Sequence, residues 1–170
     1  MSYRKIYYTS PEACTGCRVC EQVCSLHHEK SEINPKRSRI RIIDMQERGV
    51  MIPMVCRLCS PAPCVSECPV DALCQDEKTG LIIVDEEKCI GCDSCTEACD
   101  FGAIKVHPVR KKAIVCDHCE GNPECVKRCM PEALVFMKPE EYTVFRGRTT
   151  LKKDTSAIWP EHVKNANKKE

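Results

Sequence analysis

The chain has 170 residues, of which 17 are cysteine and only 5% are aromatic. This cysteine content is far above ordinary usage and indicates a scaffold built on cysteine chemistry, because so few large side chains cannot form an ordinary hydrophobic core. The 26 Lys and Arg residues nearly balance the 25 Asp and Glu residues, giving a formal net charge of +1, so we expect no nucleic-acid partner.

The N-terminal segment, Met1–Ser10, has no apolar core and no twin arginine, so it does not resemble a signal peptide. The longest aliphatic run, Leu81–Val84, is too short to span a bilayer. We therefore expect a cytoplasmic protein without a membrane span, unless a partner that carries a signal exports it. A reducing cytosol disfavours disulfides and favours metal ligation by the cysteines.

Short apolar segments alternate with cysteine-rich loops along the chain. In chain order the apolar segments are Arg4–Thr9, Arg39–Asp44, Val50–Val55, Leu81–Asp85, Ile104–Val106, Ala113–Val115 and Leu134–Met137. Each cysteine loop is expected to lead into a short helix and then into another apolar segment that starts a strand. The expected fold class is therefore α+β, with short helices and small antiparallel sheets.

The cysteines form four groups of four, with Cys74 left over. The first and third groups have the spacing C-x2-C-x2-C-x3-C, and the second and fourth lengthen the middle gap to four and five residues. The groups are Cys14, Cys17, Cys20 and Cys24; Cys56, Cys59, Cys64 and Cys68; Cys89, Cys92, Cys95 and Cys99; and Cys116, Cys119, Cys125 and Cys129. Repetition of a whole motif sets the architecture of such a chain.

This spacing suits [4Fe–4S] clusters, each of which needs four converging thiolates. A tight loop with cysteine at every third position supplies three of them, and in two-cluster ferredoxins the fourth cysteine of a run ligates the other cluster. We expect that fourth cysteine on a short helix that directs it toward the neighbouring site. Structural zinc usually pairs two C-x2–4-C knuckles across a longer gap, so zinc and disulfides are weaker alternatives.

The lengthened cysteine loops at 56–64 and 116–125 resemble those of the four-cluster electron-transfer subunits of the dimethyl sulfoxide reductase, formate dehydrogenase and hydrogenase type. The resemblance covers roughly residues 10–137. It implies that the inner groups pair with each other and the outer groups pair with each other. The implied ligand sets are Cys56, Cys59, Cys64 and Cys99; Cys89, Cys92, Cys95 and Cys68; Cys14, Cys17, Cys20 and Cys129; and Cys116, Cys119, Cys125 and Cys24.

The same resemblance implies two interleaved bacterial-ferredoxin-like modules with two clusters each. Residues 1–49 together with 107–137 would form the outer module, and residues 50–106 the inner module. Residues 138–170 would be a C-terminal extension that binds a partner or is disordered. The extension has no cysteine and contains the only tryptophan, Trp159, which favours a binding arm.

In size the chain is most similar to the small iron–sulfur subunits of tungsten aldehyde oxidoreductase and tungsten benzoyl-coenzyme A reductase. This implies an electron-transfer subunit without catalysis of its own. It would connect a tungsten- or molybdenum-pterin catalytic subunit to a flavin/NAD subunit or a ferredoxin. The open alternatives are a diffusible polyferredoxin, head-to-tail self-association into a filament, and a structural zinc-binding scaffold.

The remaining candidates lie outside the ligand sets. Cys74 is expected to be a small buried hydrophobe, the usual fate of a free cysteine. No histidine is needed as a ligand, although His118, His27 or His28 could tune a nearby cluster. The sequence contains no G-x-G-x-x-G motif, no P-loop and no catalytic triad.

Overall fold

The computed structural model describes residues 3–10, 12–30 and 32–150. Within these residues the strands form two-stranded antiparallel sheets, which are β1 (Lys5–Tyr8) with β8 (Leu134–Met137), β2 (Arg41–Met45) with β3 (Val50–Met54), β4 (Leu73–Gln75) with β5 (Ile82–Val84), and β6 (Lys105–Val106) with β7 (Ala113–Ile114). The helices are α1 (Val19–Glu29), α2 (Pro63–Ser66), α3 (Ser94–Glu97), α4 (Glu124–Lys127) and α5 (Pro139–Thr150), with 3-10 turns at η1 (Pro35–Arg37) and η2 (Gln46–Arg48). The prediction of short helices and small antiparallel sheets is confirmed.

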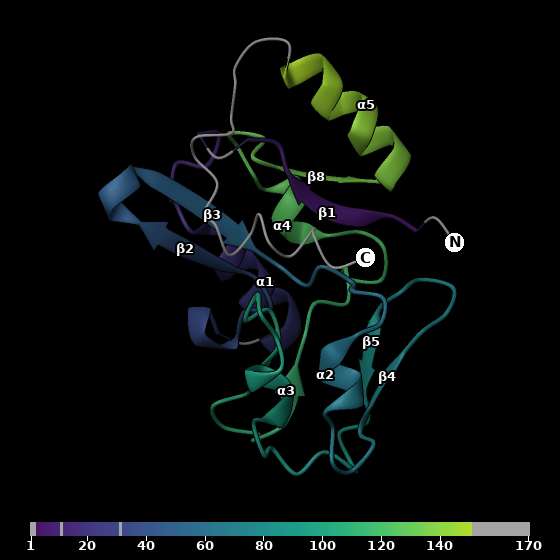
Figure 1. Cartoon of the computed structure of the whole chain (residues 1–170). Coiled ribbons are helices and arrows are strands. Elements are labelled where there is room, and N and C mark those ends of the chain that lie inside the picture. Colours follow the sequence, from purple (N-terminus) through teal and green to yellow (C-terminus); the bar gives the residue numbers. More distant parts are fainter. Residues whose placement is uncertain (1–2, 11, 31, 151–170) are drawn as a thin grey trace.

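The β1–β8 sheet joins two segments that lie far apart in the sequence. Ile6 pairs with Phe136, and Tyr8 pairs with Leu134. The sheet lies between α5 on one side and α4 on the other (Figure 1). Ile6 and Leu134 point inward and are only 2% and 4% exposed, so this sheet closes a core that also contains residues of α1.

Two hydrophobic cores organise the described part of the chain, and cysteines take part in both. The first core contains Ile6, Cys20, Cys24, Ile40, Ile42, Val55, Cys116, Cys125 and Leu134. The second core contains Ala62, Ala72, Leu73, Ile82, Cys89, Cys95, Ile104, Ala113 and Val115. The half-buried Cys56 packs against both cores. Sulfur and small aliphatic groups therefore fill the positions that aromatic side chains would take in an ordinary domain of this size.

The expectation that the fourth cysteine of each group lies on a short helix is wrong for three groups. Only Cys24 is helical, within α1, whereas α2, α3 and α4 each contain the third cysteine of their group and end before the fourth. Pro69 follows Cys68 directly, and Pro131 lies two residues after Cys129, so neither helix can continue. Cys24 is followed by neither proline nor glycine within its turn, and α1 runs on to Glu29.

Helix α5 was not expected from the sequence. The Tyr142 ring stacks on Tyr7 of β1 with 3.9 Å between ring centroids, and its hydroxyl donates a hydrogen bond of 2.9 Å to the Tyr8 carbonyl. The first part of the C-terminal extension is therefore packed against the chain itself. Trp159 lies outside the described residues.

A buried carboxylate at the end of α1 ties this helix to the turn between β6 and β7. The Glu29 side chain is 9% exposed and lies 3.3 Å from His107 Nε2, 3.4 Å from Arg37 Nη1 and 3.6 Å from Arg110 Nη2. His107 Nδ1 accepts hydrogen bonds from the backbone N–H groups of Val109 and Arg110, so its Nε2 carries the proton that faces Glu29. Burial raises the pKa of Glu29, but Arg110, His107 and Arg37 outweigh it and hold that pKa below its usual value.

Replacing Glu29 should therefore destabilise the fold. In Glu29→Ala the buried His107 and the partly exposed Arg37 and Arg110 lose their carboxylate, and losing such charge-assisted hydrogen bonds typically costs about 2 kcal/mol in the free energy of unfolding. The change is measured by guanidinium denaturation of the anaerobically purified protein, followed by far-UV circular dichroism. The exposed Glu77→Ala is the matched control and should leave the midpoint unchanged. Equal midpoints for the two variants would show that the carboxylate does not hold the two elements together.

Candidate metal centres

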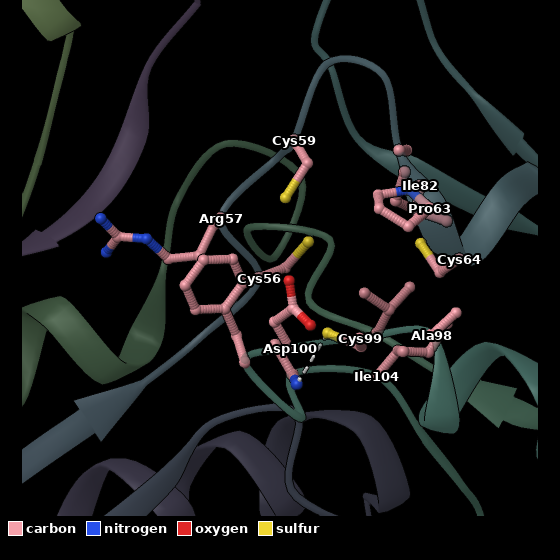
Figure 2. A pocket seen from close by; sticks show the side chains of 14 residues that line it. Cys56, Arg57, Cys59, Pro63, Cys64, Ile82, Ala98, Cys99, Asp100 and Ile104 are labelled. Atoms are coloured by element: carbon pink, nitrogen blue, oxygen red, sulfur yellow. Dashed lines mark hydrogen bonds between the residues drawn. The ribbon is translucent and has the colours of Figure 1, made fainter. Parts of the chain in front are cut away.

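Four cysteine side chains line each of three cavities in the described part of the chain. Site A is lined by Cys14, Cys17, Cys20 and Cys129; site C by Cys56, Cys59, Cys64 and Cys99; and site D by Cys68, Cys89, Cys92 and Cys95. Figure 2 shows the four sulfur atoms of site C turned toward a common space, beside the apolar side chains of Ile82 and Ile104. The structure thus brings together residues that lie up to 115 positions apart, as Cys14 and Cys129 do in site A.

The remaining expected set forms site B, which is defined by Cys24, Cys116, Cys119 and Cys125. These four side chains are all buried, with exposures between 5% and 9%. Burial raises the pKa of the Cys125 thiol, and the nearby thiols of Cys24 and Cys119 raise it further. Cys24 and Cys125 likewise act on Cys116, so the four sulfur groups lie within electrostatic reach of one another.

Each site combines three cysteines of one group with the fourth cysteine of another. The helices explain this exchange. Helix α1 carries Cys20 of site A and Cys24 of site B, and α4 carries Cys125 of site B shortly before Cys129 of site A. Helices α2 and α3 relate sites C and D in the same way. Helix α2 carries Cys64 of site C just before Cys68 of site D, and α3 carries Cys95 of site D just before Cys99 of site C.

In every cysteine loop the residue just before the second cysteine has a left-handed backbone conformation. Gly16, Leu58, Gly91 and His118 occupy this position with φ of 68°, 51°, 69° and 58°. This conformation turns the backbone N–H of Gly16 toward the sulfur of Cys14, and the same holds for Leu58 with Cys56 and His118 with Cys116. Two of the loops thus use glycine, which adopts positive φ freely, and two use a residue that does not.

A second left-handed residue follows the fourth cysteine of three groups. Asp71, Gly102 and Glu132 have φ of 50°, 52° and 50°, and each precedes a buried alanine. The N–H groups of Ala72 and Ala103 each donate a hydrogen bond of 3.3 Å to the sulfur of the preceding fourth cysteine, Cys68 and Cys99. In the first group, which departs from this pattern, the Arg39 N–H donates to Cys24 Sγ at 3.2 Å. Such hydrogen bonds stabilise negative charge on sulfur.

The electrostatics of these thiols fit a positively charged occupant. Burial, together with repulsion from the neighbouring thiolates of Cys56, Cys99 and Cys59, raises the pKa of Cys64 to about 11. Burial and neighbouring thiols also raise the pKa of Cys95 in site D to about 11. Four crowded, partly buried sulfur groups that accept N–H donors are the donor set of a [4Fe–4S] cluster, whose iron neutralises part of their charge. The residues present therefore fit this group.

The structure also places Cys74 and two of the histidines, which lie outside the ligand sets. The expectation that Cys74 is buried is wrong, because Cys74 is exposed on β4 opposite Ile83, which is itself 50% exposed. Strand alternation places both residues on the outer face. His27 and His28 have ring nitrogens within 4.8 Å of the sulfur of Cys119 and of each other, so they lie at the edge of site B.

The fold and the four-cysteine sites define an iron–sulfur protein, and comparison with known proteins gives its family. Residues 47–139 match the 4Fe–4S dicluster domain. The chain belongs to this family. It is 44% identical over 120 residues to the "Aliphatic sulfonate oxidoreductase, polyferredoxin-like subunit" of Pyrococcus furiosus, covering 71% of this chain and 68% of the relative.

Two Escherichia coli proteins match over most of their length. The chain is 42% identical to the "Putative electron transport protein YsaA" over 146 residues, covering 79% of this chain and 90% of the relative. It is 32% identical to the "Electron transport protein HydN" over 162 residues, covering 81% and 91%. Among solved structures, the active site complex BamBC of benzoyl coenzyme A reductase aligns over 99% of both chains with 22% identity and a TM-score of 0.49, a likeness too weak to build on.

None of the helices in the described segments is both long and apolar enough to cross a membrane.

The left-handed glycine of the site D loop gives a direct test of the loop geometry. A Cβ at Gly91 would lie 2.2 Å from the Lys111 carbonyl oxygen, whereas a Cβ at Gly49, with nearly the same φ, meets nothing within 4 Å. Both alanine variants carry a conformational cost of about 1 kcal/mol. Gly91→Ala should cost about 2 kcal/mol more, because the loop and the β6–β7 turn must separate.

The two variants are compared by thermal unfolding and by iron content per chain. Gly91→Ala should show the lower melting temperature and should lose iron, while Gly49→Ala keeps the wild-type iron content. If both variants behave alike, close packing of the β6–β7 turn on the site D loop does not matter for the site.

Proposed function

We propose that this chain is an electron-transfer subunit that holds four [4Fe–4S] clusters, one in each of sites A to D. The observation that carries the proposal is that sites A, C and D are cavities lined by four cysteines each, while the four buried cysteines of site B lie within electrostatic reach of one another. A cluster bound by four protein thiolates accepts and releases single electrons and has no open position for a substrate. The chain itself would therefore carry electrons and perform no substrate chemistry.

The clusters would lie in two modules. The outer module, residues 1–49 and 107–137, would hold sites A and B, and the inner module, residues 50–106, would hold sites C and D. The two cores support the pairing of the sites, because the first core contains cysteines of sites A and B, and the second contains Cys89 and Cys95 of site D with Cys56, Cys64 and Cys99 of site C packed against it. The cores share residues across the proposed bounds, since Val55 belongs to the first core and Ala113 and Val115 belong to the second. Cys56 contacts both cores, which supports a place for site C at their junction.

The order of electron transfer would be A, B, C, D or its reverse. Helices α1 and α4 link sites A and B, and α2 and α3 link sites C and D. The exposed cysteines among the proposed ligands are Cys17 in site A and Cys92 in site D, whereas all cysteines of sites B and C are buried or half-buried. Electrons would therefore enter and leave through sites A and D.

The partner at one end would be a tungsten- or molybdenum-pterin catalytic subunit, with the aldehyde oxidoreductase type favoured. The other partner would be a flavin/NAD subunit or a ferredoxin, and the complex would be cytoplasmic. Support for a catalytic partner comes from the relative that is named as a subunit of an oxidoreductase. Head-to-tail self-association into a filament is compatible with the two modules.

A free-standing, diffusible polyferredoxin is the second candidate. It is favoured by the relatives that are named simply as electron transport proteins and that match over about nine tenths of their own length. Such a carrier would use the same four sites but would form only weak, short-lived contacts with several enzymes.

Metal analysis tests the number of clusters. After anaerobic purification the chain should contain about sixteen iron and about sixteen sulfide per protein and no zinc. Cys64→Ser should lower the iron content by about four, because Cys64 belongs to site C, while Cys74→Ser should keep the full content. Zinc in place of iron, or an equal loss in both variants, would contradict the proposed ligand sets.

Co-purification distinguishes a fixed subunit from a diffusible carrier. A fixed subunit should copurify with a catalytic subunit that contains tungsten or molybdenum, and native mass spectrometry should show one discrete complex rather than a filament. Deletion of residues 151–170, which lie outside the described residues, should abolish this complex if the extension is the binding arm. Deletion of residues 140–170 also removes most of α5, so the shorter deletion is the cleaner test. A chain that always purifies alone would favour the diffusible carrier.

A further inference from the structure

Lys5 reaches from β1 into the cysteine loop of site C. Its Nζ donates hydrogen bonds to the carbonyl oxygens of Arg57 at 3.3 Å and of Leu58 at 3.2 Å. These are the two residues between Cys56 and Cys59, so one ammonium group binds both backbone carbonyls that lie between these cysteines. The side chain is half-buried, and its ammonium also lies 5.2 Å from the centre of the Tyr3 ring.

The loop that Lys5 holds is one of those that lack glycine at the left-handed position. Leu58 is 1% exposed and has φ of 51°, a conformation that costs a residue with a Cβ about 1 kcal/mol. The Leu58 N–H nevertheless has to face the Cys56 sulfur. Hydrogen bonds from Lys5 to the carbonyls on this turn offset that cost and keep the N–H directed at sulfur.

The ammonium group also lies within electrostatic reach of the site C thiols. Burial, followed by the nearby Arg57 charge, lowers the pKa of Lys5 from its usual 10.5, while Cys59 and Cys56 counteract that lowering. The positive charge of Lys5 in turn lowers the pKa of both thiols, against the larger effect of their burial. The Arg57 charge within the loop also lowers the pKa of Cys59, but Lys5 is directed at site C from outside the loop, from strand β1 next to Ile6 of the first core.

We propose that Lys5 is a positioning residue for the Cys56–Cys59 loop and raises the reduction potential of the cluster in site C. This inference rests on the proposed function. Reduction adds one electron and one unit of negative charge to the site, with no bond formed or broken, and a nearby cation favours the more negative state. With Lys5 nearby, the cluster in site C, one of the two central sites, would be easier to reduce than with the site C thiolates alone.

The test is a redox titration of the loaded protein with dithionite, followed by electron paramagnetic resonance. In Lys5→Met one of the cluster signals should move to lower potential while the others stay in place. The signal that moves should be the one that Cys59→Ser alters, which assigns it to site C. Lys5→Arg, which keeps the charge and the donors, should restore the wild-type potential, and the exposed Lys36→Met should shift nothing.

A further variant separates charge from folding. Lys5→Gln keeps an N–H donor but removes the charge, so its site C signal should also move to lower potential, even if Lys5→Met loses iron from that site. An unchanged site C potential in Lys5→Gln, or an equal shift of every cluster, would overturn the inference while leaving the proposed function intact. Failure of the proposed function would appear earlier, as a wild-type protein without about sixteen iron per chain.

Discussion

At sites A, C and D four cysteine thiols line one small cavity, although burial and mutual repulsion oppose the ionisation of several of them. The pKa of Cys20 is raised to about 12, first by burial and then by neighbouring negative groups, and Cys64 and Cys95 follow the same rule. A cationic occupant removes this conflict, so metal loading and folding are expected to be coupled. The surrounding elements also need such support, because isolated two-stranded sheets and four-residue helices have little stability of their own.

The repetition of the chain is more regular in its backbone than in its residues. The loops of sites A and D have glycine before the second cysteine, whereas those of sites C and B have Leu58 and His118, yet all four positions have positive φ. The constraint is therefore the direction of the backbone N–H toward sulfur, and glycine is only the least strained way to meet it. Where glycine is absent, other contacts assist. Lys5 holds the carbonyls around Leu58, and the His118 ring packs edge-on against Phe136.

Local pattern was enough to predict much of the fold. Strand β8 coincides with the predicted segment Leu134–Met137, and six other strands lie within one or two residues of a predicted apolar segment beside a cysteine loop. Strand β4 (Leu73–Gln75) had no predicted segment. The family resemblance, rather than the repeat itself, indicated which cysteines should gather in space. The sequence did not predict features that depend on single tertiary contacts or on the face of a strand. Helix α5 has almost no amphipathic pattern and depends on Tyr142 meeting Tyr7, and Cys74 is exposed because of its strand face rather than its residue type.

Charge shows the same limit of sequence reasoning. A net charge of +1 does not show where the charged groups lie relative to the sites. Lys5 faces the site C loop, Lys112 donates a 2.6 Å hydrogen bond to the Cys89 carbonyl in site D, and the half-buried Lys105 interacts with Cys24 of site B. At site A the nearest charged influence on Cys20 is instead the buried carboxylate of Glu21, which Ile42 N–H and Arg18 hold in place. The chain therefore surrounds chemically identical ligand sets with unequal charges, and identical clusters placed in them would differ in potential because of that difference.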